Sequence, residues 1–305
     1  MYKSDPELGG VIAENFYNTS REFNNLGFQR RGDTGLAARK KALRIIAHGG
    51  STTFSYNVPM DDTWPAQLER LLRTSGAVDT EVLNAGDVMW SHGHALIRAK
   101  RELPKLRPDY VIIYSGINEG ANYWRLKLND GIDLGRKLAA SKHGIINNDL
   151  MKASFLFRNS VVFKLFHHRV VPMIKSLRPV SGSAQPEKFD PAILQNFRLV
   201  LKDLVELTAI SGGKVIYVVQ AMQTDLTEMS EIGQAWSKSA VMRNSFLARD
   251  YARELGAIVI DAQEAVRLSG SPSEKLFAPS KVHYSAAGGK ILAHYIYDQV
   301  LQRRP

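Results

Sequence analysis

The feature that most constrains the fold is a repeated alternation of short apolar runs with longer amphipathic stretches. The runs are rich in β-branched residues, are bounded by glycine or polar residues, and occupy residues 43–47, 81–83, 110–114, 214–219 and 257–260. Runs of this kind are typical of strands buried on both faces of a parallel sheet. The alternation therefore predicts an α/β fold, with a central parallel sheet of about five strands between two layers of helices.

The stretches between the runs carry helix signals. Thr63 followed by Trp64 and Pro65 predicts a helix start, because threonine caps a helix and proline fits its first turn. Ser285 is predicted to cap the last helix, which runs to about residue 301. Apolar spacing predicts three further helices, over residues 95–103, 197–209 and 238–255.

This alternation accounts for residues 41–305 as one domain. Residues 1–40 are polar and rich in glycine and asparagine, and we expect them to wrap the core as an N-terminal extension. Residues 121–190 are expected to form an insertion, which contains 12 Lys/Arg and 5 Asp/Glu residues. This basic segment holds most of the formal charge of +10. Its apolar stretch 151–166 favours a helix that covers the sheet or the site, although a membrane-surface role stays open.

Composition removes several classes of protein. The chain has 305 residues and no cysteine, which excludes a disulfide scaffold, cysteine-ligated zinc, an iron–sulfur cluster and a thiol nucleophile. No run reaches the roughly 18 apolar residues of a membrane span. The first residues lack the apolar core of a signal peptide, so the compartment stays open between the cytoplasm and, after removal of a leader, the periplasm or exterior. The basic charge comes with no nucleic-acid motif, and we expect no nucleic-acid partner.

Polar segments follow the first three runs and precede the last helix. They are Gly49-Gly50-Ser51-Thr52-Thr53, Asn84-Ala85-Gly86-Asp87, Ser115-Gly116-Ile117-Asn118-Glu119 and Ser280-Lys281-Val282-His283. Ligands of parallel α/β sheets bind at the carboxyl ends of the strands, which brings these segments to one edge. Acyl transfer needs a nucleophile, a base and oxyanion donors, for which Ser51 and His283 are candidates as nucleophile and base. The candidate donors are the backbone N–H groups of Gly86 and Ser51 and the side-chain amide of Asn118.

These four segments resemble the blocks G-[DG]-S-x-T, N-x-G, G-x-N-[DE] and D-x-x-H of the SGNH (GDSL-type) hydrolase superfamily. Residues 5–9, 24–30 and 64–68 also resemble an esterase branch with an N-terminal extension. The resemblance covers nearly the whole chain outside 121–190. It implies a flavodoxin-like three-layer α/β/α sandwich, and esterase, deacetylase or related acyl-transfer activity without a metal or cofactor.

One departure from the resembled pattern concerns the acid of the catalytic triad. Ser280 occupies the position of the aspartate three residues before His283. That acid normally fixes the histidine tautomer and stabilises the imidazolium. Three arrangements stay open. A backbone carbonyl or the Ser280 hydroxyl orients His283 in a working dyad, another acid such as Asp261 or Glu274 reaches it, or the enzyme is impaired.

Other polar and aromatic residues near the blocks have less specific interpretations. Glu119 stands where aspartate is commoner, and a structural role is favoured for it. His92 and His94 are two residues apart, which is not a metal-ligand spacing on a helix, so a structural or surface role is favoured. Candidate pocket walls are Trp90, Trp124 and Gln220.

The leading hypothesis is a serine hydrolase that removes an acyl group, with acetyl expected, from an oxygen ester of a small molecule or carbohydrate. The basic insertion suits an anionic substrate. One alternative is an O-acyltransferase, which forms the same acyl-enzyme on Ser51. Another is a catalytically impaired carbohydrate-binding protein, for which Ser280 is the argument. The sequence leaves the ester and the oligomeric state open.

Overall fold

The structure is a computed structural model, and it describes residues 2–5, 7–18, 21–35, 43–88, 90–119, 191–223 and 245–302. Several predictions lie outside the described residues: the insertion 121–190 with its helix 151–166, Trp124, and the first part of the helix 238–255. None of the described helices is long and apolar enough to cross a membrane.

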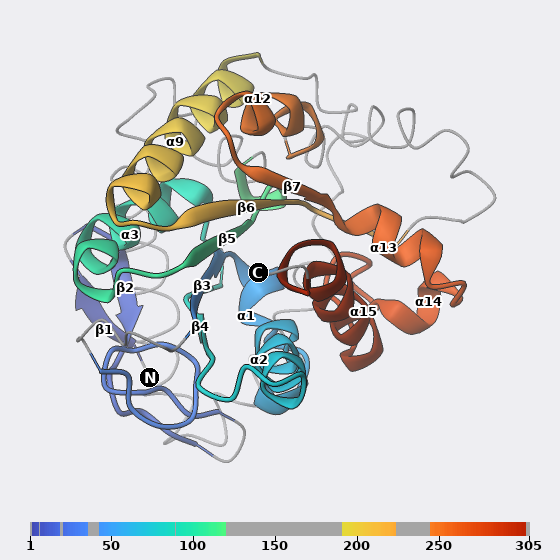
Figure 1. Ribbon diagram of the computed structural model, residues 1–305, viewed down its shortest axis with the longest axis horizontal. Helices are drawn as coiled ribbons and strands as arrows, with labels where there is room; N and C mark the ends of the chain where they lie inside the picture. Colours follow the sequence, from blue (N-terminus) through green and yellow to red (C-terminus); the bar gives the residue numbers. More distant parts are fainter. Residues whose placement is uncertain are drawn as a thin grey trace, which may run out of the picture.

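The centre of the molecule is a five-stranded parallel sheet (Figure 1). Its strands lie in the order β4-β3-β5-β6-β7. Their bounds are β3 Arg44–Gly49, β4 Glu81–Asn84, β5 Tyr110–Tyr114, β6 Lys214–Val219 and β7 Ile258–Asp261. Each corresponds to one of the five apolar runs, and the predicted parallel sheet is confirmed.

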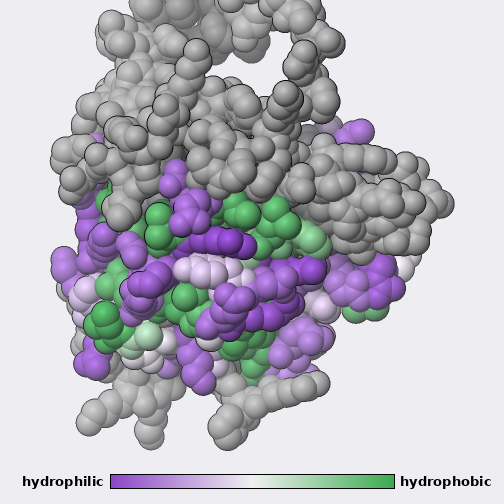
Figure 2. Space-filling view, turned by 90° about the horizontal axis from the view of Figure 1, so that it is seen from above, coloured by the Kyte–Doolittle hydropathy of each residue, from purple (hydrophilic) through white to green (hydrophobic). Residues whose placement is uncertain are grey.

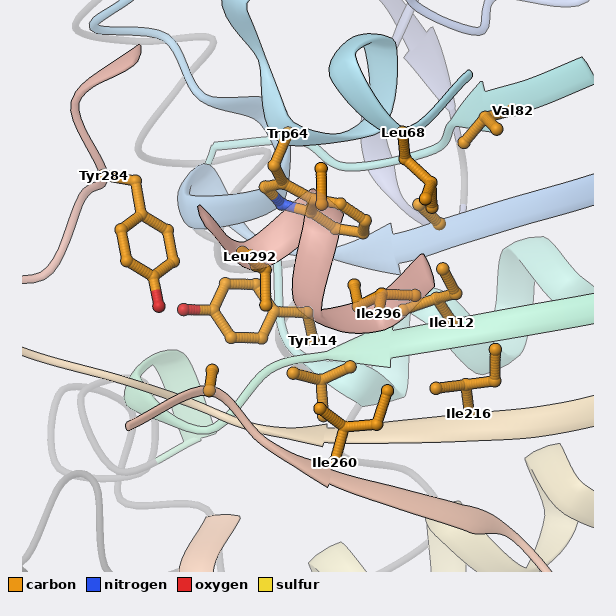
Figure 3. Close-up of a cluster of buried hydrophobic side chains, with 14 of the residues drawn as sticks. Trp64, Leu68, Val82, Ile112, Tyr114, Ile216, Ile260, Tyr284, Leu292 and Ile296 are labelled. Carbon is orange, nitrogen blue, oxygen red and sulfur yellow. The ribbon is translucent and has the colours of Figure 1, made fainter. Parts of the chain in front are cut away.

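Helices cover both faces of the sheet, which makes the predicted three-layer sandwich (Figure 1). One layer holds α2 Trp64–Thr74, α13 Ala262–Leu268, α14 Ser273–Leu276 and α15 Ala286–Ile296. The other holds α3 His92–Leu106, α9 Pro191–Ile210 and α12 Arg249–Glu254. Side chains alternate across a strand, so Ile45 faces the first layer and Ile46 the second. Figure 3 shows the first of these two cores, with Trp64 and Leu68 packed over Ile112.

The helix starts follow their capping residues. The Thr63 hydroxyl accepts from the N–H of Ala66 at the start of α2, and the Ser285 hydroxyl accepts from that of Gly288 at the start of α15. The helix predicted from residue 95 begins earlier, at His92, because Ser91 caps it. The Nδ1 atom of His94 accepts from the Ser91 N–H at 3.2 Å, which completes a capping box with histidine in the place of the usual glutamate.

The N-terminal residues pack against the sandwich. They form the hairpin β1 Tyr2–Asp5 with β2 Gly9–Ile12, and Arg101 of α3 binds the Asp5 carboxylate at 2.6 and 3.1 Å. Further along, Phe23 and Phe28 are fully buried. This segment, expected to be a polar wrapping, therefore buries aromatic residues of its own.

One described face of the sandwich is mixed in polarity. Figure 2 views the molecule from above Figure 1, and on the described part of that face hydrophilic residues surround smaller hydrophobic areas.

Candidate active site

The nucleophile candidate lies where β3 ends. Ser51 begins α1, a single helical turn over Ser51–Phe54 that follows Gly49 and Gly50. A Cβ atom on Gly50 would lie 2.2 Å from Asn118 Nδ2, and one on Gly49 would lie 2.3 Å from the Tyr114 carbonyl oxygen. The two glycines therefore allow β3 to end against the end of β5, which brings Ser51 close to Asn118.

The base candidate is held by its neighbours in the loop between α14 and α15. Tyr284 is buried, and its ring stacks on Phe277 with centroids 4.8 Å apart. The His283 carbonyl accepts from the Ala278 N–H at 2.8 Å. The Asn57 side chain donates to the Tyr284 carbonyl at 2.8 Å. These contacts fix the backbone on both sides of the imidazole.

Ser51, His283 and Ser280 form a continuous hydrogen-bond chain. His283 Nε2 lies 2.8 Å from Ser51 Oγ, and His283 Nδ1 lies 2.8 Å from Ser280 Oγ. When the Ser280 oxygen accepts from Nδ1–H, the lone pair of Nε2 is directed at the Ser51 hydroxyl. This is the tautomer that a general base needs.

The other candidate acids make different contacts. Asp261 caps α13, where its carboxylate accepts from the Gln263 N–H at 2.9 Å. Glu274 is exposed in the first turn of α14. Within the described ranges no carboxylate is hydrogen-bonded to His283, so the geometry matches the arrangement in which the Ser280 hydroxyl orients the ring.

The environment of His283 favours the neutral imidazole. Burial lowers the pKa of His283 below its ordinary value of 6.5. The ring of Tyr56 meets that of His283 edge to face, with centroids 4.8 Å apart and an interplanar angle of 69°. Sequence reasoning missed Tyr56, because nothing in a loop after the first block signals contact with a histidine more than 200 residues away.

Two of the three predicted oxyanion donors are open in the described part of the structure. Asn118 Nδ2 donates to the Trp90 carbonyl at 2.7 Å, and its second N–H has no acceptor among the described residues. No described group accepts from the Ser51 N–H. The Gly86 N–H, by contrast, donates to Asn84 Oδ1 at 3.0 Å. A Cβ on Gly86 would lie 2.6 Å from the Phe54 nitrogen, so close packing against α1 explains this glycine. The oxyanion role of the Gly86 N–H stays a prediction. Its hydrogen bond to Asn84 Oδ1 already engages this N–H and does not favour that role.

Glu119, the residue after Asn118, forms a buried hydrogen-bonded pair with His92. Glu119 accepts from the N–H of His92 at 2.7 Å and lies 2.6 Å from His92 Nδ1. The other ring nitrogen of His92 lies 3.2 Å from the Phe197 carbonyl oxygen. Glu119 and His92 therefore have the structural roles that the sequence favoured, and they tie the segment after β5 to the start of α3.

Two of the three candidate pocket walls, Trp90 and Gln220, are internal supports. Both side chains are fully buried. Gln220 accepts from the Ile117 N–H at 2.9 Å and donates to the Thr52 hydroxyl at 3.0 Å, so it joins the segments of the first and third blocks. Among the described residues no group of three or more histidine, aspartate or glutamate side chains is placed to hold a metal ion.

Comparison with known proteins gives hydrolases as neighbours. No protein-family model matches the chain. An arylesterase from Vibrio mimicus is 30% identical over 84 residues, which are 28% of this chain and 42% of that protein, so the chain spans less than half the length of this curated relative. The crystal structure of an acetylxylan esterase from Geobacillus stearothermophilus has 18% identity and a TM-score of 0.50, over 86% of this chain and 97% of that one.

The chain shares the fold of this esterase, and the α/β fold that the sequence resemblance implied is thus confirmed. A further structural neighbour is a member of the lipolytic G-D-S-L family from Veillonella parvula, with 15% identity and a TM-score of 0.49 over 86% of this chain and 100% of that one.

Proposed function

We propose that this chain is a carboxylic ester hydrolase in which Ser51 is the nucleophile and His283 the general base. The observation that carries the proposal is the hydrogen-bond chain from Ser280 through His283 to Ser51, with both distances at 2.8 Å. It stands at the carboxyl ends of the strands, where ligands of such sheets bind. The names of the neighbours, an arylesterase and an acetylxylan esterase, support ester chemistry.

The reaction has two steps. Ser51 Oγ attacks the ester carbonyl carbon while its proton passes to His283 Nε2. The negative charge that develops on the carbonyl oxygen is met by the Ser51 N–H and the Asn118 amide. The tetrahedral intermediate expels the alcohol, which takes the proton from Nε2, and leaves an acyl-enzyme. Water then attacks the acyl carbon, His283 takes its proton, and the acid departs as Ser51 regains its hydrogen.

The proposed substrate is an acetyl ester of a small alcohol or a carbohydrate. The acetyl group and the sugar come from the names of the neighbours. If a sugar hydroxyl replaces water in the second step, the same acyl-enzyme gives O-acyl transfer.

A second candidate function follows from Ser280. A hydroxyl orients the imidazole but carries no charge to stabilise the imidazolium, and loss of the acid of a triad, with its orienting role and its charge, costs about 10⁴-fold in kcat. An SGNH fold that binds a carbohydrate with little turnover is therefore the alternative.

Hydrolysis of 4-nitrophenyl acetate separates the two candidates. The hydrolase proposal expects turnover above the buffer rate that is lost in both Ser51→Ala and His283→Ala. His294→Ala, which changes an exposed histidine on α15, is the matched control and should retain activity. Turnover that persists in Ser51→Ala would refute the assigned nucleophile, and no turnover by the intact chain would favour the binding protein.

A further inference from the structure

A large cavity lies beside the base candidate, between the N-terminal segment and the loop after α1. It has a volume of about 1040 Å³ and is lined by residues from 15–18, 21–24, 31–33 and 56–61. This volume is slightly above the range of about 300–1,000 Å³ that is usual for small-ligand sites. Tyr56 lines the cavity and also contacts the ring of His283. One wall of the cavity is therefore in direct contact with the proposed general base, while His283 and Ser51 are not among the lining residues.

Its lining combines exposed tyrosine rings with side-chain amides. Tyr17 is 78% exposed and Tyr56 is 51% exposed, although large aromatic side chains are usually buried. Asn15, Asn18 and Asn57 lie among them. A tyrosine offers a flat apolar face with a polar edge, and an asparagine amide offers both donors and acceptors. A ligand with C–H faces and many hydroxyl groups matches both.

The lining of the cavity carries more acidic than basic side chains, with Glu22, Asp33 and Asp61 against Arg21 and Arg31. Arg31 binds Asp61 through two nitrogens, at 2.9 and 3.3 Å. Arg21 donates to the carbonyls of Ser55 and Val58, both at 3.0 Å, and its guanidinium lies over the Phe54 ring. With these cations engaged, the lining gives little attraction to an anion. The amides and ion pairs also interrupt any apolar surface that a hydrocarbon chain would need.

The proposed reaction fixes which part of the ester faces the cavity. His283 returns its proton to the oxygen of the departing alcohol, so the alcohol leaves on the His283 side of the acyl carbon. Tyr56, which lines the cavity, contacts the imidazole that gives up this proton. A long alcohol portion would therefore extend along the cavity.

We infer that this cavity is the binding site for the alcohol portion of the ester, and that this portion is a neutral carbohydrate chain. The inference rests on the proposed function, because it extends the Ser51 site. It names a neutral sugar where the basic insertion had suggested an anionic one.

The kinetic test compares monosaccharide and tetrasaccharide acetates with 4-nitrophenyl acetate. The acetates are made from neutral hexoses and pentoses, and a matching set made from uronic acids tests the preference for a neutral sugar. We expect kcat/KM to be higher for neutral tetrasaccharides than for monosaccharides. Tyr17→Ala should lower the ratio of tetrasaccharide to aryl acetate kcat/KM roughly 3- to 10-fold, the size of one aromatic contact. Tyr17→Phe keeps the ring and should preserve the ratio. Equal kcat/KM for short and long neutral esters, an unchanged ratio in Tyr17→Ala, or preference for uronic esters would overturn the inference.

A binding measurement keeps this inference separate from the proposed function. NMR spectra of Ser51→Ala, which cannot form the acyl-enzyme, are recorded with the de-esterified neutral tetrasaccharides. Shifts of the amides of residues 15–18 and 56–58 are expected. Aryl acetate turnover without such shifts from any tetrasaccharide would overturn the carbohydrate site alone. Shifts without any ester hydrolysis would overturn the hydrolase and keep the carbohydrate site.

Discussion

At the residue scale, the distinctive feature is a histidine oriented by a hydroxyl. Ser280 Oγ lies 2.8 Å from His283 Nδ1, the nitrogen that a carboxylate binds in a catalytic triad, and it orients the ring as an acceptor of Nδ1–H. It is exposed and neutral, so it adds no charge opposite the imidazolium that forms when Ser51 gives up its proton. The orientation of the His283 ring is therefore kept, and the electrostatic stabilisation of its imidazolium form is lost.

Substitution of Ser280 separates these two effects. Ser280→Asp adds the missing charge and should raise kcat for 4-nitrophenyl acetate by about tenfold or more, within the roughly 10⁴-fold effect of a triad acid. Ser280→Ala removes the acceptor of Nδ1–H and should lower kcat. Steady-state kinetics on both variants test this. If both match the original chain, Ser280 has no part in orienting His283.

The pKa of His283 sets the acid limb of the pH profile. The general base works as the neutral imidazole, and burial lowers the pKa of this group below 6.5. Activity should therefore rise with pH through a midpoint below 6.5 and be nearly constant above it. In Ser280→Asp the new carboxylate favours the imidazolium and should move the midpoint upward. The pH dependence of kcat/KM measures both midpoints, and an original midpoint well above 6.5 would contradict the assignment.

At the element scale, strands were easier to predict than the contacts at their ends. Short β-branched runs such as Val111–Ile113, which is fully buried, are typical of strands inside a sheet covered on both faces, so their pattern predicts the strands. The start of α3 was missed because His94 takes the capping-box position usually held by glutamate or glutamine. The sequence shows that Gly86 permits a close approach but not that α1 packs against it, and the oxyanion role of its N–H stays a prediction.

The buried His92–Glu119 pair joins two elements, and its removal should be costly. Glu119→Ala leaves His92 without its carboxylate and should destabilise the fold by about 3–5 kcal/mol. Urea unfolding gives this value. Glu206→Ala on α9, which removes an exposed pair with Lys202, is the control and should change stability little. Equal stability of the two variants would show that the buried pair does not hold α3 to the segment after β5.

At the scale of the whole molecule, the N-terminal segment reaches the active site. Arg21 holds the carbonyls of Ser55 and Val58, and the loop between them presents Tyr56 to His283. Gln29 also forms an antiparallel bridge with Asn84 at the end of β4. Such contacts join residues far apart in the chain. They leave no periodicity or motif in the sequence, and only the fold reveals them.

Arg21→Ala tests this connection. It removes both hydrogen bonds to the Tyr56 loop, and the displaced ring no longer supports His283, so kcat for 4-nitrophenyl acetate should fall by about tenfold. Arg253→Ala changes an exposed arginine on α12 and serves as the matched control. A loss of kcat that is the same in both variants, or absent from both, would show that the N-terminal segment does not act on the base.

The most direct test of the account is labelling with a fluorophosphonate, followed by intact-mass measurement and peptide mapping. The probe reacts only with a serine whose proton is taken by a base, so it reports the Ser51–His283 pair without knowledge of the substrate. If Ser51 and His283 form the catalytic pair, one adduct is expected, on Ser51, and it is absent from Ser51→Ala and strongly reduced in His283→Ala. An adduct on another serine, or no adduct on a folded chain, would contradict it.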